Sequence, residues 1–271
     1  MLKSLCVCTQ NSSFIPYITY QNETVFAHYN GITIARCKNC GLLKTFSKNI
    51  KPQTSNSKTY EDKKENYAKL FQPILETIKN SKKNGSILDV GCSSGILLEL
   101  LQKQGYTVNG VEPNADAYKI AYSKFKDKIF NGTLTDFTKV NKKTFDVVIY
   151  NHVLEHIPNP AEEINNVKKL LKKNGVLIIG VPNTDNVIFY LRKKYWESLL
   201  PDQHIWHFST NYLKRFLKEN GFEVVEKSYS NYEREDYPVL KRIYFSLLVL
   251  INKILGTGEA VLLTYERIST D

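Results

Sequence analysis

Short apolar runs alternate with amphipathic ones from residue 86 to residue 181, and this alternation constrains the fold more than any other feature of the sequence. Five apolar runs are predicted to be buried strands: 86–91, 107–112, 127–131, 145–150 and 175–181. Three segments between them have the periodicity of helices: 95–105, 114–126 and 160–173. Strands that alternate with helices form a mostly parallel sheet with helices on both faces, so the expected fold class is α/β.

The sequence on either side of this region completes the expected domain. Helical periodicity over 60–80 precedes it. A helix over 209–220 follows it, with Ser209 or Thr210 as the N-cap. Two more strands are predicted at 222–229 and 260–267, and a long excursion separates them. The prediction is therefore a sheet of seven strands.

A glycine turn with the sequence LDVGCSSG joins the first predicted strand to its helix. Glycine lets a ligand approach the backbone closely, and the helix start that follows offers free N–H groups to an anion such as a carboxylate. Ser93 lies between Gly91 and Gly95, so the turn is not the G-x-G-x-x-G of dinucleotide sites. Asp89 would repel a pyrophosphate and suits a cationic ligand. Glu112 ends the next strand, where nucleotide-binding sheets place the acid that holds ribose hydroxyls.

These residues resemble the first motif of the class I methyltransferases that depend on S-adenosylmethionine (SAM). SAM carries an ammonium, a sulfonium, a carboxylate and a ribose, which match this mixture of charges. The resemblance implies SAM as the cofactor and a Rossmann-like sheet of seven strands in which the last strand is antiparallel. It also implies a set of cofactor-binding residues: Asp89, Gly91, Cys92, Gly95, Glu112, Pro113, Asn151 and His152. For Cys92 we favour a structural role within the loop.

A second motif, NHVLEHIP, follows the fourth of the predicted strands. Ligands of open α/β sheets lie at such strand ends. The segment resembles the "vLEH" motif of the small-molecule methyltransferases that include ubiquinone-type and sugar-modifying enzymes. This resemblance implies that Asn151 and His152 lie near the methionine part of SAM. It implies that Glu155 and His156 orient the site or approach the substrate, with a purely structural His156 as the alternative.

The segment 202–209 contains two histidines, an acid and two aromatic residues, which is dense for a loop. The resemblance places it over the acceptor pocket. Methyl transfer to a hydroxyl requires a positioned acceptor and removal of its proton, and a histidine can accept that proton near neutral pH. We therefore predict His204 or His207 as the general base with Asp202 as its orienter, and His156 as a third candidate catalytic residue. The alternative is aromatic packing under a lid, with the histidines bonded to backbone.

Four of the five cysteines lie near the N-terminus, as Cys6-x-Cys8 and Cys37-x-x-Cys40. Four thiolates suit tetrahedral zinc, and C-x-x-C-G is a good metal-binding turn. Several methyltransferases of the group that the chain resembles carry a similar module. The first pair departs from the usual C-x-x-C spacing, and a set of small buried cysteines is the alternative. We predict a zinc-ribbon-like module over 1–58, which includes a polar linker at 48–58, and a methyltransferase domain over 59–271.

The formal net charge is +10, which permits an anionic partner or an ordinary lysine-rich surface. No apolar run is long enough to span a bilayer and no signal-peptide pattern is present, so a cytoplasmic protein is expected. The excursion over 237–255 is basic and apolar. Three roles fit it: contact with a membrane surface, a cover for the acceptor site, or a homodimer interface. We favour the last two.

Together these patterns predict a SAM-dependent methyltransferase with a structural zinc ion. The expected acceptor is a small, anionic molecule, first a hydroxyl of a sugar, a nucleotide-linked sugar or a surface-glycan precursor. An RNA-modifying methyltransferase is the first alternative, but the sequence lacks a concentrated basic and aromatic tract, so nucleic acid is not the expected partner. A non-catalytic SAM-binding scaffold protein is the second alternative.

Overall fold

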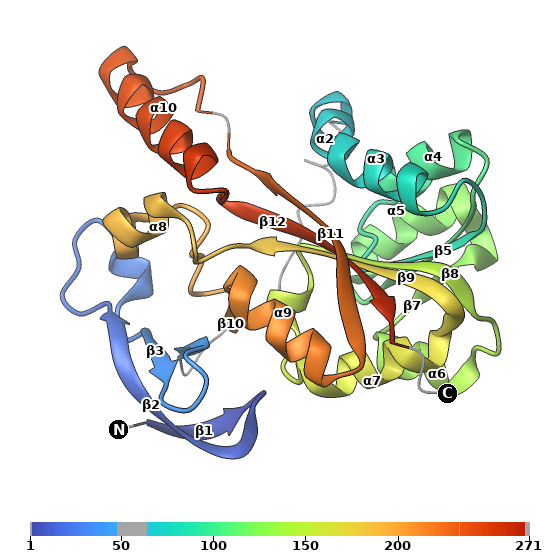
Figure 1. The fold of residues 1–271 in the computed structure, drawn as a ribbon, viewed down its shortest axis with the longest axis horizontal. Helices are drawn as coiled ribbons and strands as arrows, with labels where there is room; N and C mark the ends of the chain where they lie inside the picture. The colour runs from blue at the N-terminus through green and yellow to red at the C-terminus, as the bar shows by residue number, and fades with distance from the viewer. Residues whose placement is uncertain (1, 48–63, 233, 269–271) are drawn as a thin grey trace.

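The computed structural model describes residues 2–47, 64–232 and 234–268, and it contains two sheets (Figure 1). The larger sheet has seven strands in the order β11-β12-β9-β8-β5-β6-β7. Its members are β5 (Ser86–Val90), β6 (Thr107–Glu112), β7 (Ile129–Asn131), β8 (Phe145–Asn151), β9 (Leu171–Pro182), β11 (Phe222–Ser230) and β12 (Ala260–Arg267). β12 is antiparallel to both of its neighbours, while the pairs among β5 to β9 are parallel. The predicted sheet, with its last strand antiparallel, is confirmed.

Helices cover both faces of this sheet because successive strand residues point to opposite sides. On one face, Ile87 and Val147 pack with α3 (Gln72–Ser81), α4 (Ile96–Lys103) and α5 (Ala115–Phe125). On the other face, Leu88 and Val148 pack with α6 (Leu134–Val140), α7 (Pro160–Leu170) and α9 (Thr210–Glu219). α2 (Lys64–Leu70) precedes α3. The Rossmann-like arrangement of helices on both faces is therefore confirmed.

Two differences from the expected elements have local causes. The helix predicted over 160–173 ends at Leu170, because buried Leu171 pairs with Phe145 and begins β9. This is four residues earlier than the strand predicted to start at residue 175. The helices α6 and α8 (Val187–Arg192) were not predicted, since seven and six residues are too few to show a clear helical period.

The N-terminal residues form the second sheet, of five strands in the order β1-β2-β3-β4-β10. Its strands are β1 (Leu2–Cys6), β2 (Thr9–Thr19), β3 (Thr33–Cys37), β4 (Leu43–Phe46) and β10 (Trp206–His207). β10 comes from the segment between β9 and α9, and Trp206 pairs with Lys44. The N-terminal sheet is thus completed by a strand from far along the chain. The predicted linker over 48–58 lies outside the described residues, and the division of the chain at residues 58 and 59 stays a prediction.

The excursion between β11 and β12 contains α10 (Val239–Ile254), which packs beside α8 and projects away from the sheet (Figure 1). None of the described helices has both the length and the apolarity needed to cross a membrane.

Candidate functional site

A cavity of about 1450 Å³ opens where the strands β5, β6, β8 and β9 end. Ligands of open α/β sheets bind at this edge, where the carboxyl ends of parallel strands meet. Clefts for a single small ligand commonly measure roughly 300–1,000 Å³, so this cavity has room for a cofactor and an acceptor together. Residues from each of these strand ends line it: Asp89, Gly91, Glu112, Asn151, His152 and Gly180.

The glycine turn brings Gly91, Cys92 and Ser94 to the cavity wall. Gly91 has φ +72°, and a Cβ built on it would lie 2.6 Å from Val153 Cγ2. Gly95 has φ +81°, and its Cβ would lie 2.8 Å from Phe125 Cε2. Gly95 is also the N-cap of α4 and supplies no side-chain cap, which leaves the helix start open to a ligand. Both positions therefore require glycine for conformation and for space.

Two buried acids, Asp89 and Glu112, lie behind this turn. The Glu112 carboxylate accepts hydrogen bonds from the Ser93 N–H at 2.8 Å and from the Asn114 N–H at 2.7 Å. Burial raises the pKa of Glu112, and burial together with the charge of Glu112 raises the pKa of Asp89 to about 8. Within the described residues, neither acid takes part in an ion pair. This corner of the cavity is complementary to a cationic ligand that also offers hydrogen-bond donors.

Of the remaining predicted cofactor residues, three line the cavity and Gly95 does not. Cys92, Pro113 and Asn151 are among its lining residues. The Cys92 thiol packs toward the sheet, since a Cβ on Gly110 would lie 2.6 Å from its Sγ. Cys92 is therefore part of the apolar core as well as of the loop.

His152 and Glu155 form a carboxylate–imidazole pair at the end of β8. His152 adopts φ +55°, and its N–H donates to the Gly180 carbonyl at 2.8 Å. Its Nδ1 lies 3.4 Å from Glu155 Oε1. Glu155 is only 1% exposed, and neither carboxylate oxygen has a hydrogen-bond partner within the described residues. Burial on its own would raise the pKa of Glu155, but His152 and the neighbouring histidines hold it below its usual value.

His156, in the short helix η3 (Leu154–His156), is the one predicted catalytic histidine that lines the cavity. Its Nδ1 lies 3.1 Å from the Gln203 carbonyl oxygen. A carbonyl only accepts hydrogen bonds, so this contact keeps the proton on Nδ1 and leaves Nε2 with a free lone pair. The ring of His204 packs edge-on against His156, with the ring centres 4.8 Å apart.

His204 and His207 lie behind the cavity wall and are not among its lining residues. Both are buried, and His207, on β10, shares a 2.8 Å hydrogen bond with Thr45 Oγ1 of the N-terminal sheet. Burial lowers the pKa of His204 to about 4 and that of His207 to about 3. No hydrogen bond joins Asp202 to either histidine in the described part of the chain. The structure thus brings His152 and His156 to the cavity, and not the two histidines of the 202–209 segment.

Sequence reasoning missed one wall of the cavity, which comes from the segment after β11. Asn231, Tyr232 and Glu235 line it there. Burial is the main cause that raises the pKa of Tyr232 to about 12, so its hydroxyl stays protonated. No motif marks these residues, because their place depends on how the excursion folds back over the sheet.

The four N-terminal cysteines gather in one cluster. Their sulfur atoms all lie within 4.8 Å of one another, with Cys6 Sγ 3.6 Å from Cys40 Sγ and Cys8 Sγ 3.7 Å from Cys37 Sγ. Tetrahedral zinc with Zn–S bonds near 2.3 Å separates its sulfurs by about 3.8 Å, so the cluster has the dimensions of such a site. All four cysteines are free of disulfides. The short Cys6-x-Cys8 spacing is accommodated because Cys6 ends β1 and Cys8 lies in the turn that leads into β2.

A second group of possible metal ligands lies at the cavity. Glu155, His156 and His204 each offer one ligand atom, and these atoms also lie within 4.8 Å of one another. Of the three, only His156 lines the cavity, and Glu155 is the residue that also pairs with His152.

Known proteins resemble this chain in sequence. A family model described as "Methyltransferase domain" matches residues 61–227. The ubiquinone biosynthesis O-methyltransferase of Glaesserella parasuis is 35% identical over 127 residues, which are 42% of this chain and 54% of that protein. The enzyme of the same name from Colwellia psychrerythraea is 29% identical over 168 residues, or 57% of this chain and 67% of that protein. The chain spans about half the length of the first curated relatives it matches.

Solved structures share the fold at low sequence identity. A SAM-dependent methyltransferase from Archaeoglobus fulgidus has a TM-score of 0.55 at 19% identity, over 79% of this chain and all of that one. A putative methyltransferase of Haloferax volcanii, solved with the activator Trm112, has a TM-score of 0.59 at 14% identity, over 80% and 95%. The plantazolicin methyltransferase BpumL, solved with S-adenosylhomocysteine (SAH), has a TM-score of 0.54 at 16% identity, over 80% and 92%. Because the family model covers more than half of the sequence, the chain belongs to the methyltransferase domain family.

Proposed function

We propose that this protein is a SAM-dependent O-methyltransferase that acts on a hydroxyl group of a small molecule. One observation carries the proposal: Asp89 and Glu112, two buried acids with no ion-pair partner among the described residues, share a cavity wall with the open glycine turn. SAM supplies a cation and a ribose to such a site, and it donates the methyl group. The methyltransferase family of the chain supports the same cofactor.

Each lining residue then has a role in holding SAM. Glu112 accepts the ribose hydroxyls, and Asp89 faces the positive charge of the methionine part. Gly91 brings backbone to the cofactor, Gly95 leaves the start of α4 open to it, and Asn151 lies beside the methionine part. Cys92 and Pro113 shape the pocket by packing. These roles rest on positions in the cavity lining and, for Gly95, on its place as the N-cap of α4.

We infer that the proton of the acceptor hydroxyl passes to a histidine of the NHVLEHIP segment. His152 is the proposed base, because Glu155 lies against its Nδ1 and stabilises the imidazolium that forms. His156 is the second candidate, through the free Nε2 that its Gln203 contact leaves. His204 and His207, the bases predicted from sequence, are assigned a packing role, since neither lines the cavity.

The proposed acceptor is a small hydroxyl compound, first a sugar, a nucleotide-linked sugar or a surface-glycan precursor. The net charge of +10 favours an anionic acceptor. Oxygen as the acceptor atom is favoured by the O-methyltransferase names of the curated relatives. Those names point to ubiquinone biosynthesis rather than to carbohydrate, so a phenolic acceptor belongs in the same screen.

We also propose that Cys6, Cys8, Cys37 and Cys40 bind a structural zinc ion. The sulfur separations support this proposal, because four thiolates so close together repel one another unless a cation neutralises them.

Calorimetry of SAM and SAH binding tests the cofactor. The wild type is expected to bind both, and Glu112→Ala should weaken binding by at least about tenfold, because bonds to a charged group are worth roughly 1.5–3 kcal/mol. Glu219→Ala removes an exposed acid of α9 and serves as the matched control. A folded wild type that binds neither compound overturns the proposal. Binding with no turnover on any acceptor would leave the scaffold alternative in its place.

A further inference from the structure

The helix α10 has one buried face and one exposed apolar face. Its inward face is narrow and consists of Phe245, Leu248 and Asn252, all buried. Phe245 lies between two guanidinium groups, with Arg234 Cζ 4.0 Å and Arg192 Cζ 4.9 Å from its ring centre. These contacts fix which side of α10 faces the body of the protein.

The opposite side carries a continuous row of exposed apolar side chains, which we term the α10 stripe. Each member lies three or four residues from another member: Leu240, Ile243, Tyr244, Leu247, Leu250, Ile251 and Ile254. Residues at that spacing share one face of a helix. Leu240 is 83% exposed, Ile254 is 74% exposed and every other member is at least 40% exposed, so this face is largely open to solvent. Apolar rows of this kind mark interaction surfaces.

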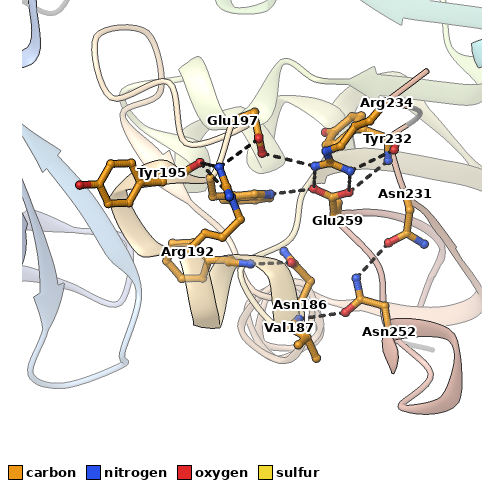
Figure 2. A network of polar contacts seen from close by, with 12 residues as sticks. Asn186, Val187, Arg192, Tyr195, Glu197, Asn231, Tyr232, Arg234, Asn252 and Glu259 are labelled. Carbon is orange, nitrogen blue, oxygen red and sulfur yellow. Dashed lines mark hydrogen bonds and ion pairs between the residues drawn. The ribbon is translucent and has the colours of Figure 1, made fainter. Parts of the chain in front are cut away.

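Buried polar contacts hold α10 in this position, so the stripe is not left exposed by a loose helix (Figure 2). Arg234 precedes α10 and pairs with the fully buried Glu259 at 2.6 Å. Near the other end of α10, Asn252 accepts from the Val187 N–H at 2.9 Å and donates to Asn231 at 3.0 Å. Rotating the stripe inward would break these contacts and leave buried polar groups without partners.

The charges on α10 all have one sign. Lys241, Arg242 and Lys253 are its charged residues, and no acidic residue occurs between 239 and 258. Within the described residues, none of the three takes part in an ion pair. In a twofold dimer the stripe would meet its own copy and bring these cations together without counter-charges. An anionic surface supplies the missing charge, and a lipid bilayer also accepts the apolar stripe.

We propose that the α10 stripe docks this protein on the surface of an anionic lipid bilayer. The helix lies in the plane of the interface, with its apolar row among the upper acyl chains and its basic side chains at the lipid phosphates. This binding is peripheral, since α10 has 16 residues. Asn231 both lines the cavity and holds Asn252, so the docked helix fixes the cavity relative to the bilayer.

Vesicle co-sedimentation with the full chain tests the proposal. The wild type is expected to bind vesicles of phosphatidylcholine with phosphatidylglycerol, to bind phosphatidylcholine alone much more weakly, and to dissociate as salt is raised. Leu240→Glu with Leu247→Glu should weaken binding by more than about tenfold, because each change removes apolar area and adds a repelled charge. Val140→Glu on α6, where the side chain is 67% exposed, is the matched control and should bind as the wild type does.

Three controls decide between outcomes. SAH binding and thermal melting of each variant show that it is folded, because the stripe lies outside the cavity lining. Leu247→Trp, quenched by lipids brominated in the acyl chain, reports insertion directly. Failure of the folded wild type to bind anionic vesicles overturns the proposal. A second result would also overturn it. In that result the wild type is a dimer that does not bind vesicles, and the Leu240→Glu and Leu247→Glu double variant is a monomer, so that the stripe is a dimer interface.

Discussion

At the scale of single residues, Asp89 and Glu112 show that the proposed cofactor site lowers the stability of the ligand-free protein. The pKa of Asp89 is raised to about 8 in the folded chain by burial and by the charge of Glu112, whereas an unfolded aspartate titrates near pH 4. Between these pH values the folded state holds a proton that the unfolded state has lost. The stability of the ligand-free protein therefore falls as pH rises through this window.

Denaturant unfolding across pH tests this reading. We expect the free energy of unfolding to fall by at least about 1 kcal/mol from pH 5 to pH 8, since one pKa unit corresponds to about 1.4 kcal/mol. Asp89→Asn should flatten the slope, because the amide does not ionise, while Glu219→Gln should leave it unchanged. Saturating SAM should also reduce the slope, because its cation stabilises the ionised carboxylate. An unaltered slope in Asp89→Asn would refute the assignment.

The assignment of His152 as the general base is also tested by single substitutions. His152→Ala should lower kcat by about 100-fold or more, the usual loss when a general base is removed, while SAH affinity changes little. Glu155→Gln keeps the shape of its partner but removes the charge that stabilises the imidazolium, so kcat should fall there too. His28→Ala, an exposed histidine of the N-terminal part, is the control. SAH release is the assay, and wild-type turnover in both His152→Ala and His156→Ala would exclude this segment as the source of the base.

At the scale of elements, the strand β5, its glycine turn and the helix α4 form one unit. The turn meets the segment after β8, where Val153 packs over Gly91. Strand, turn and helix are local features, but the contact with Val153 exists only because β5 and β8 are neighbours in the sheet. The turn is thus supported by Val153, which lies 62 positions after Gly91 in the sequence.

Gly91→Ala separates the contribution of the local turn conformation from that of the contact with Val153. We expect it to lower stability by about 1–3 kcal/mol, because alanine is strained at φ +72° and its Cβ would lie 2.6 Å from Val153 Cγ2. Gly105→Ala is the matched control, with φ +91° and nothing within 4 Å, and it should show the conformational cost alone. Adding Val153→Ala to Gly91→Ala should recover part of the loss. Equal losses in Gly91→Ala and Gly105→Ala, by thermal melting, would contradict the packing argument.

At the scale of the whole molecule, the cysteine cluster is coupled to the large domain. β10 completes the N-terminal sheet, and Arg215 of α9 donates to the Cys40 carbonyl at 3.0 Å. The cysteines and the β8 and α9 residues also belong to one apolar cluster. Loss of the proposed zinc ion should therefore loosen more than the N-terminal strands.

Metal analysis and chelation test this coupling. We expect about one zinc ion per chain and a melting temperature that falls by several degrees on chelation, with the loss shared by SAH-binding affinity. Cys8→Ser should reduce the zinc content, whereas Cys92→Ser should retain it, because Cys92 lies at the cavity. A well-folded chain without zinc, unaffected by chelators, would show that the cluster is a set of packed thiols.

The sequence by itself determined the features that depend on neighbouring residues. Hydrophobic periodicity located the seven strands and the main helices, and Ser209 caps α9 by accepting from the Tyr212 N–H as predicted. The resemblance of LDVGCSSG and NHVLEHIP to known motifs placed Asp89, Glu112 and His152 at one sheet edge, because strands of a parallel sheet end on the same side. The four cysteines were grouped by their residue type and spacing.

Only the tertiary structure decided the features that depend on contacts between distant segments. His207 is buried where β10 pairs with β4, and His204 is buried against His156; no local pattern encodes either contact. Asn231 and Tyr232 reach the cavity because the excursion folds back and Arg234 pairs with Glu259. The face of α10 that is covered is likewise set by its packing on α8. Local propensity depends on residues a few positions apart, whereas burial depends on which surfaces meet after the chain has folded.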